Sequence, residues 1–321
     1  MNKIIIDCDP GVDDAVAIFL ALASPEIELI GITTVAGNVE LEKVHNNARQ
    51  LLALANRQDI PLAKGCERPL MSKSGSKTHV HGTDGLAGVL LPASDYPNYS
   101  GHAVDFIIDT VMSNPGEITL CTIASLTNIA VAIIKEPKLV DNVKDIVVMG
   151  GAAFTQGNIT PAAEFNFYVD PHAAHIVFDS ARHITMLGLD VTSKADIRAG
   201  LCNPLEKGGL IAQTVAEMCR RYAEFDPFLH DPCVIAYLIK PEIFSGIDGS
   251  ITIEYESNKL FGHSFAYTST SINHDPKAKY NEAKCKIITD VDTSKLISLI
   301  TERIINLWGK EYQLEPRLII I

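Results

Sequence analysis

The sequence is short of positive charge and has no long hydrophobic run. Its 27 Lys and Arg residues are outnumbered by 39 Asp and Glu residues, which gives a formal net charge of −12. A chain of that sign repels phosphate groups, so we predict no nucleic-acid partner. Acidic membranes are excluded for the same reason, and no apolar run approaches the roughly 20 residues that a membrane-spanning helix needs. We therefore expect no membrane partner.

Paired cysteine motifs and an export signal are also missing. The seven cysteines are odd in number and scattered, and none stands in C-x-x-C spacing. This usage is typical of reduced core residues in a cytosolic protein. The N-terminus enters an apolar run directly, without a basic region or a cleavage site before it, so we expect no export. The predicted location is cytoplasmic.

Short β-branched runs alternate with helical patterns along the 321 residues, of which 47% are hydrophobic. This alternation indicates βαβ units and a largely parallel sheet in an α/β fold. Ligands of such sheets bind beyond the carboxyl ends of the strands. The predicted strands are 3–6, 29–34, 118–122, 146–149 and 185–189, with further strands at 251–255 and 286–288. The predicted helices include 15–23, 42–56, 104–113, 129–135, 171–180 and 293–308.

Four carboxylates crowd into the eight residues that follow the first predicted strand, Asp7, Asp9, Asp13 and Asp14. Like charges this close repel by several kcal/mol at an effective dielectric of about 20, and a bound cation reverses the sign. The first two acids lie at a strand end, whereas the last two open a helix whose N-terminus favours negative charge. Ligands that are all oxygen suit Ca²⁺ or Mg²⁺. The pattern predicts a metal site at a strand–helix junction.

Other interpretations of this acidic run explain less of it. An EF-hand loop requires its glycine at the sixth position and an acid at the twelfth, but Gly11 is fifth and Ile18 is twelfth. A phosphohydrolase of the haloacid dehalogenase type matches Asp7 and Asp9, yet Gly11 replaces the expected Thr or Val. A solvated acidic helix cap is the structural alternative. The metal site accounts for all four acids.

Nine short motifs occur in order along nearly the whole chain. They are DCDPGVDDA from Asp7, ITTVAGN ending at Asn38, HVHG around His81, LTNIA from Leu126, VVMGG ending at Gly151, GNITPAAEFN from Gly157, DPHAAH from Asp170, GLDVT from Gly188 and HDPC from His230. In this set the chain resembles the nucleoside hydrolase family of the inosine-uridine preferring type. The resemblance implies one domain over residues 1–321, with a central mixed, mostly parallel sheet flanked by helices. It also implies Ca²⁺-dependent hydrolysis of the N-glycosidic bond of ribonucleosides.

The resemblance also implies which residues form the site. The expected calcium ligands are Asp9, Asp14, Asp231 and the backbone carbonyl of Ile123. The residues expected to hold the ribose hydroxyls are Asp13, Asn38, Asn158, Glu164, Asn166 and Asp231, and Met149 is expected to line the same cavity. Taken alone, Asn158 and Glu164 would equally suit polar turns that satisfy their own backbone.

Hydrolysis of an N-glycosidic bond passes through an oxocarbenium-like state, which a cluster of acids stabilises. Asp9 resembles the general base that takes a proton from water. His230 resembles the acid of the leaving group, since an ordinary histidine pKa of about 6.5 permits donation near neutral pH. His81 resembles a loop histidine near the base, and the surrounding loop 72–85 is predicted to be a mobile flap. Tyr222 and Phe225, three residues apart, are predicted to share a helix face toward the base, and core packing of aromatics at helical spacing is an equal alternative.

The predicted substrates are small ribonucleosides of the uridine, cytidine and inosine class, with a preference for pyrimidines or for mixed uridine and inosine use. Because the expected contacts bind the ribose hydroxyls, we predict that the site rejects 2′-deoxyribose, which lacks one of them. The family resemblance implies a homo-oligomer, either a dimer or a tetramer, and a role in nucleoside salvage or catabolism. A metal-dependent phosphohydrolase and a non-catalytic nucleoside-binding protein stay as alternatives.

Overall fold

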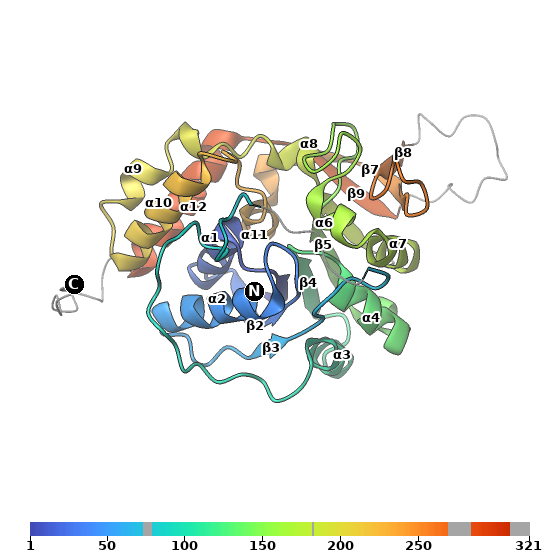
Figure 1. Ribbon diagram of the computed structural model, residues 1–321, viewed down its shortest axis with the longest axis horizontal. Coiled ribbons are helices and arrows are strands. Elements are labelled where there is room, and N and C mark those ends of the chain that lie inside the picture. The colour runs from blue at the N-terminus through green and yellow to red at the C-terminus, as the bar shows by residue number, and fades with distance from the viewer. Residues whose placement is uncertain (73–78, 182, 269–283, 309–321) are drawn as a thin grey trace.

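Nine strands of the described part of the chain form one sheet (Figure 1). This computed structural model describes residues 1–72, 79–181, 183–268 and 284–308, so positions 73–78 of the predicted flap lie outside the described residues. The sheet order is β3-β2-β1-β4-β5-β6-β9-β7-β8. The strands are β1 (Asn2–Cys8), β2 (Ile27–Thr34), β3 (Leu62–Lys64), β4 (Ile118–Thr122), β5 (Asp145–Met149), β6 (Ile184–Leu187), β7 (Phe244–Ile253), β8 (Ser264–Thr268) and β9 (Cys285–Val291).

The sheet is mixed and mostly parallel, which confirms the predicted fold class. All pairings from β3 to β9 in the sheet order are parallel, whereas β7 pairs antiparallel with both β9 and β8. The chain leaves β1 for β2 and β3, and it then returns to β4 on the other side of β1. The carboxyl ends of β1 and β4 therefore flank a topological switch point, which is where open α/β sheets bind ligands.

Helices cover both faces of the sheet. The helices are α1 (Val12–Leu22), α2 (Leu41–Leu54), α3 (Ala103–Ser113), α4 (Thr127–Lys135), α5 (Leu139–Asn142), α6 (Phe165–Val169), α7 (Pro171–Ser180), α8 (Leu189–Thr192), α9 (Cys202–Leu205), α10 (Leu210–Tyr222), α11 (Pro232–Ile239) and α12 (Thr293–Trp308). One layer holds α1, α10, α11 and α12 in mutual contact, and the other holds α3, α4, α5 and α7. Short 3₁₀ helices span Ile197–Ala199 and Pro241–Ile243.

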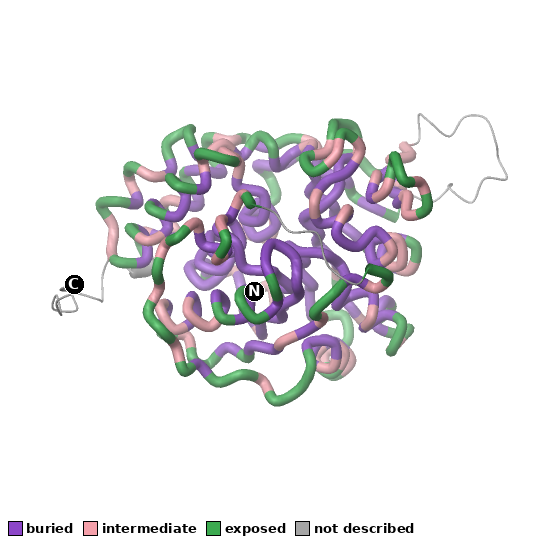
Figure 2. The backbone as a smooth tube through the Cα atoms, viewed as in Figure 1, coloured by how far each residue is buried: buried purple, intermediate pink, exposed green. Residues whose placement is uncertain are grey.

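The first strand shows how the sequence produces two cores. Ile4, Ile6 and Cys8 pack into the core beneath α1 and α10 to α12, whereas Ile5 packs into the core beneath α3 and α4. Successive side chains of a strand point to opposite faces, so a continuous apolar run is what a strand buried on both faces requires. Buried residues accordingly fill the centre of the molecule, and exposed residues lie around them (Figure 2).

Several predicted elements have other bounds in the structure. The strand predicted at 185–189 ends at Leu187, because Gly188 takes an extended conformation that caps α8 from Leu189 onward. The strand predicted at 251–255 is the end of β7, which begins at Phe244. The short strands β3 and β8 were not predicted, since brief apolar runs do not distinguish a strand from a loop.

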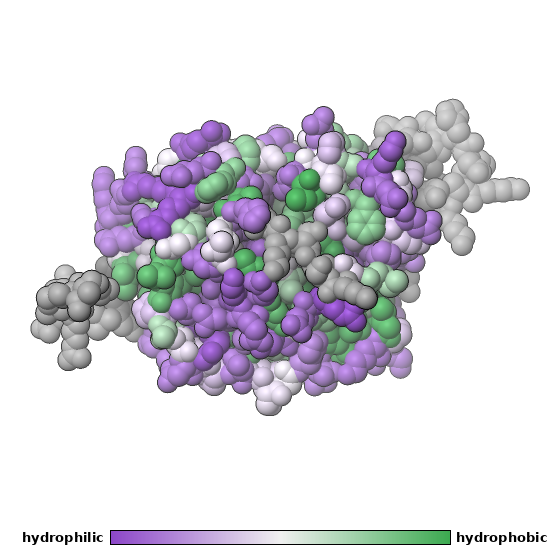
Figure 3. Space-filling view, viewed as in Figure 1, coloured by the Kyte–Doolittle hydropathy of each residue, from purple (hydrophilic) through white to green (hydrophobic). Residues whose placement is uncertain are grey.

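Hydrophilic residues predominate on the face shown in Figure 3, with apolar residues interspersed among them. Among the described residues, no helix combines the length and the apolar character needed to cross a membrane. The seven cysteines are free thiols, and five of them are buried.

Candidate active site

A pocket opens beyond the carboxyl ends of β1, β4 and β5. Its cavity volume is about 60 Å³. Val80, Phe165 and Asp226 also line it, although sequence reasoning had not selected them. The predicted site residues that line it are Asp9, Asp13, Asn38, His81, Ile123, Met149, Asn158, Glu164, Asn166, Tyr222, His230 and Asp231.

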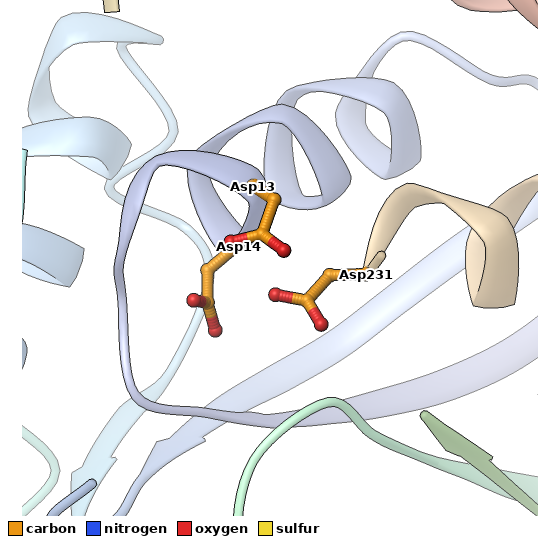
Figure 4. Close-up of side chains that lie close together, drawn as sticks. All are labelled: Asp13, Asp14 and Asp231. Carbon is orange, nitrogen blue, oxygen red and sulfur yellow. The ribbon is translucent and has the colours of Figure 1, made fainter. Parts of the chain in front are cut away.

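Three carboxylates converge beside this pocket, and two of them, Asp13 and Asp231, line it, whereas Asp14 does not. Asp13 and Asp14 open α1 and Asp231 caps the start of α11, so two helix N-termini bring the side chains to face one another (Figure 4). Their nearest oxygens all lie within 4.8 Å of one another, and all three residues are buried. Burial, and then the charge of Asp13, raises the pKa of Asp14 to about 7. Burial and then the charges of Asp13 and Asp14 raise the pKa of Asp231 well above its ordinary value.

This acid group differs from the expected ligand set, because it contains Asp13 and lacks Asp9. The Oδ2 of Asp9 instead accepts the backbone N–H of Asn38 at 2.6 Å, and Asn38 Nδ2 donates to the Asp9 carbonyl at 3.1 Å. A Cβ at Gly37 would lie 2.0 Å from Asp9 Oδ2, so the loop after β2 fits closely around this carboxylate. The position of Asp9 is thus set by β1 and by the Gly37-Asn38 turn. Its role as a metal ligand stays a prediction.

Asp7, the first acid of the run, lies outside the pocket. Its Oδ1 accepts hydrogen bonds from Thr33 Oγ1 at 2.5 Å and Asn128 Nδ2 at 2.8 Å, while Oδ2 is buried without a hydrogen-bond partner. Burial raises the pKa of Asp7 to about 7. A phosphohydrolase of the haloacid dehalogenase type would need this carboxylate in contact with substrate. The structure therefore does not favour that alternative.

His230 is held by partners on both ring nitrogens. Its Nδ1 lies 2.8 Å from Thr192 Oγ1, and its Nε2 lies 3.2 Å from Asp226 Oδ2. Burial alone would lower the pKa of His230, but the Asp226 carboxylate outweighs burial and the net direction is upward. A raised pKa favours the protonated ring, which is the form that a proton donor requires.

His81 contacts residues 7–14, here named the acidic loop, directly. Its Nδ1 accepts the backbone N–H of Val12 at 3.2 Å, so the ring proton resides on Nε2. Burial lowers the pKa of His81, which keeps the ring neutral. The ring stacks on Tyr222, with centroids 5.0 Å apart and planes 18° apart. A neutral donor and an aromatic face thus stand together on one wall of the pocket.

The loop from Gly150 to Glu164 supplies the opposite wall. Glu164 caps α6: its Oε1 accepts the backbone N–H of Asn166, and its Oε2 accepts those of Gly151 and Phe167. Asn158 Oδ1 accepts the N–H of Phe165 at 2.9 Å. These polar side chains satisfy the local backbone and also line the pocket, so the structural and the functional interpretations hold together. Their contacts with ribose stay a prediction.

Comparisons with known proteins agree on one family. The model of the family "Inosine-uridine preferring nucleoside hydrolase" matches residues 4–298. The inosine-uridine preferring nucleoside hydrolase of Leishmania major is 45% identical over 254 residues, which cover 76% of this chain and 81% of that protein. This chain belongs to the nucleoside hydrolase family. The pyrimidine-specific ribonucleoside hydrolase RihA of Salmonella gallinarum is 39% identical over 311 residues, 94% of this chain and 97% of that protein. The solved structure of a plant nucleoside hydrolase has a TM-score of 0.90 and 32% identity, and the match covers 95% of this chain and 99% of that one.

The protein is therefore a ribonucleoside hydrolase, and the family is generally metal-dependent. The acid group fits a hard divalent cation, because three buried carboxylates face one another with no Lys or Arg among the residues that line the pocket. Uncompensated charges of this kind are costly to bury, and carboxylate oxygens are the ligands that Ca²⁺ and Mg²⁺ prefer. The family assignment and the chemistry of the side chains point to the same site.

One residue expected to face the base of the nucleoside lies elsewhere. Helix α10 ends at Tyr222, and the backbone N–H groups of Phe225 and Asp226 both donate to the Tyr222 carbonyl. This turn leaves Phe225 69% exposed and outside the pocket, and it directs Asp226 inward instead. The prediction that Tyr222 and Phe225 share a helix face is wrong for this reason. Residues 223–230 are not helical, so the spacing of Asp226 and His230 gave no sequence signal for their contact.

Proposed function

We propose that this nucleoside hydrolase depends on Ca²⁺ and acts on ribonucleosides of the uridine, cytidine and inosine class. The observation that carries the proposal is the buried group Asp13, Asp14 and Asp231 beside a pocket whose polar lining is mainly carboxylate and amide. The Leishmania relative is named for inosine and uridine, and the Salmonella relative is named for pyrimidines. Uridine is the substrate that both names include.

The residues that would hold the cation are Asp14 and Asp231, with Asp9, Asp13 and the carbonyl of Ile123 around them. Ca²⁺ suits this set better than Mg²⁺, because it accepts six to eight oxygens in irregular geometry. When bound, the ion lowers the pKa of water and gathers the ribose hydroxyls around itself. Asn166 Nδ2 lies 3.5 Å from the Ile123 carbonyl oxygen and 3.2 Å from that of Met149, so an amide group separates these two carbonyls.

Asp9 takes the proton of the attacking water. The backbone N–H of Asn38 holds one of its oxygens, which fixes the orientation of the carboxylate and leaves the other oxygen for the water. As the water oxygen bonds to the anomeric carbon, the C–N bond breaks and its electron pair goes to the leaving nucleobase. The carboxylates of Asp9, Asp13 and Asp231 stabilise the positive charge that develops on the ribosyl ring.

His230 donates the proton that lets the base leave as a neutral molecule. Thr192 and Asp226 orient its ring, and the Asp226 carboxylate raises the pKa of His230 despite burial, which favours the donor form. The proton gained by Asp9 and the proton lost by His230 balance, and the products are ribose and the free base. Return of a proton to His230 through solvent completes the cycle.

Wider parts of the proposal rest on the family resemblance. We expect the enzyme to work as a homo-oligomer, a dimer or a tetramer, in cytoplasmic nucleoside salvage or catabolism. No nucleic-acid partner is part of this proposal, because the pocket is small and its lining includes five carboxylate side chains, Asp9, Asp13, Glu164, Asp226 and Asp231.

The test is a steady-state comparison of uridine, cytidine, inosine, adenosine and 2′-deoxyuridine with the Ca²⁺-loaded enzyme. We expect kcat/KM to be highest for the first three, and lower by roughly 10⁴-fold for 2′-deoxyuridine, because the groups that bind the 2′-hydroxyl lose their partner. Removal of the metal by a chelator should abolish turnover, and added Ca²⁺ should restore it. Full activity after verified metal removal would refute the Ca²⁺ dependence, and equal rates for uridine and 2′-deoxyuridine would refute the ribose contacts.

A further inference from the structure

A buried asparagine outside the pocket joins the acidic loop to the segment that carries His81. Asn47 lies on α2 and is 5% exposed. Its Nδ2 donates to the Pro10 carbonyl at 3.1 Å and to the Asp84 carbonyl at 2.9 Å. Pro10 stands between Asp9 and the start of α1, and Asp84 follows His81 by three residues. One amide group therefore satisfies a carbonyl of each segment.

The segment 79–88, here named the His81 segment, touches α2 and α10 as well. Lys43, one helical turn before Asn47, donates from Nζ to the Thr83 carbonyl at 2.9 Å. Arg221 Nη1 donates to the Gly88 carbonyl at 2.9 Å. Both of these cations are exposed, whereas the contact of Asn47 with Pro10 is buried and that with Asp84 is partly buried. A hydrogen bond that water cannot replace determines position more strongly than an exposed one.

Close packing surrounds this contact. Gly85 has a φ of +89°, and a Cβ there would lie 2.7 Å from Asn47 Nδ2 and 3.1 Å from the Pro10 carbonyl oxygen. Gly11 shows the same closeness on the pocket side, where a Cβ would lie 2.7 Å from His81 Nδ1. The His81 segment thus fits closely at two points, where His81 meets Gly11 and where Gly85 meets Pro10 and Asn47. Neither point has space for a side chain.

We propose that Asn47 is a positioning residue that sets His81 against the acidic loop. Without its amide, the Pro10 and Asp84 carbonyls would be buried and unpaired, and the two segments would separate to reach water. The His81 ring would then lose the fixed Nδ1 contact with the Val12 N–H that keeps Nε2 as the donor toward the pocket. This inference rests on the proposed function, because it takes the pocket that His81 lines to be the nucleoside site.

The experiment compares Asn47→Ala with Asn46→Ala in the Ca²⁺-loaded enzyme. Asn46 is the neighbouring exposed residue of α2, and its Nδ2 donates only to the Gln50 side chain, at 3.1 Å. We expect Asn47→Ala to lower kcat/KM for uridine by about 10- to 100-fold, as loss of an outer hydrogen-bond partner does elsewhere. Amide hydrogen exchange in 79–88 should accelerate in the same variant. Asn46→Ala should change neither quantity.

A double-mutant cycle with His81→Ala separates positioning from a general loss of stability. If Asn47 acts through His81, then Asn47→Ala should add less than about twofold in the His81→Ala background. An undiminished effect there, or unchanged exchange in 79–88, would overturn the proposal. Should Asn47→Ala fail to fold, Gly85→Ala displaces the same segment at the same contact and enters the same cycle. A wild-type enzyme inactive on every ribonucleoside would remove the proposed function, whereas the exchange result would still decide the role of Asn47.

Discussion

Raising the pH should destabilise the metal-free enzyme, and Asp14 should account for a measurable share of that loss. Burial and the charge of Asp13 raise the pKa of Asp14 from 3.8 to about 7. Below pH 3.8 the carboxyl is protonated in both the folded and the unfolded chain, so its contribution to stability is complete. Between that pH and about 7 only the unfolded chain ionises, and the contribution is lost.

The size of the loss follows from the pKa. At about 1.4 kcal/mol for each pKa unit, a rise of about three units corresponds to about 4 kcal/mol. Domains unfold with only about 5–15 kcal/mol, so the loss is a large share of the total. It corresponds to a fall in Tm on the order of 5–10 °C. A bound cation reverses the effect, because it stabilises the ionised carboxylates and adds about 2.7 kcal/mol at a hundredfold excess over Kd.

The assay is scanning calorimetry of the metal-stripped enzyme at about pH 5 and about pH 8, beside the variant Asp14→Asn. The amide has nearly the same shape and does not titrate, so the fall in Tm with pH should be smaller in the variant. Asp7, whose pKa burial also raises to about 7, remains in both proteins and supplies their common background. Added Ca²⁺ should raise the Tm of the wild type at the higher pH and leave that of the variant nearly unchanged. An identical fall in both proteins would refute the electrostatic reasoning.

Two further variants test the geometry of the pocket. Gly37→Ala places a Cβ 2.0 Å from Asp9 Oδ2, so it should lower kcat by about 100-fold, as misplacement by about 1 Å does in other sites; an unchanged kcat would remove Asp9 as the base. Tyr222→Ala removes the ring stacked on His81 and should raise KM for uridine by about tenfold, the cost of one well-packed ring. Phe225→Ala, at a residue 69% exposed, is the matched control, and a rise in KM equal to that of Tyr222→Ala would contradict the pocket lining.

The sequence was sufficient for the parts of the site that local patterns encode. The run Ile4-Ile5-Ile6 is apolar on both faces, as a strand buried on both sides requires, and the acids that follow it lie at the carboxyl edge of the sheet. Asp13 and Asp14 occupy the first turn of α1, as their place before an apolar helix predicted. Pocket residues far apart in sequence, such as Asp231, came from the family resemblance, because no local pattern links them.

Contacts between segments were beyond what the sequence could predict. Whether Phe225 or Asp226 turns inward depends on where α10 ends, and α-helical spacing alone continues past that end. Asn47 stands in a polar stretch of α2 beside Asn46, and only packing shows that one is buried and the other is not. The assignment of Asp13 to the acid group likewise required the distance between two helix N-termini.

The two histidines of the pocket show how one residue type serves two purposes. Both are buried, and burial alone lowers the pKa of each. His230 donates to the carboxylate of Asp226, which outweighs burial and raises its pKa. His81 instead accepts a backbone N–H on Nδ1, a bond that only the neutral ring can form, and its pKa is lowered. Environments that move two pKa values apart separate an acid from a neutral donor. The different hydrogen-bond partners, a carboxylate for His230 and a backbone amide for His81, therefore go with opposite pKa shifts, and the role of His230 as proton donor stays a prediction.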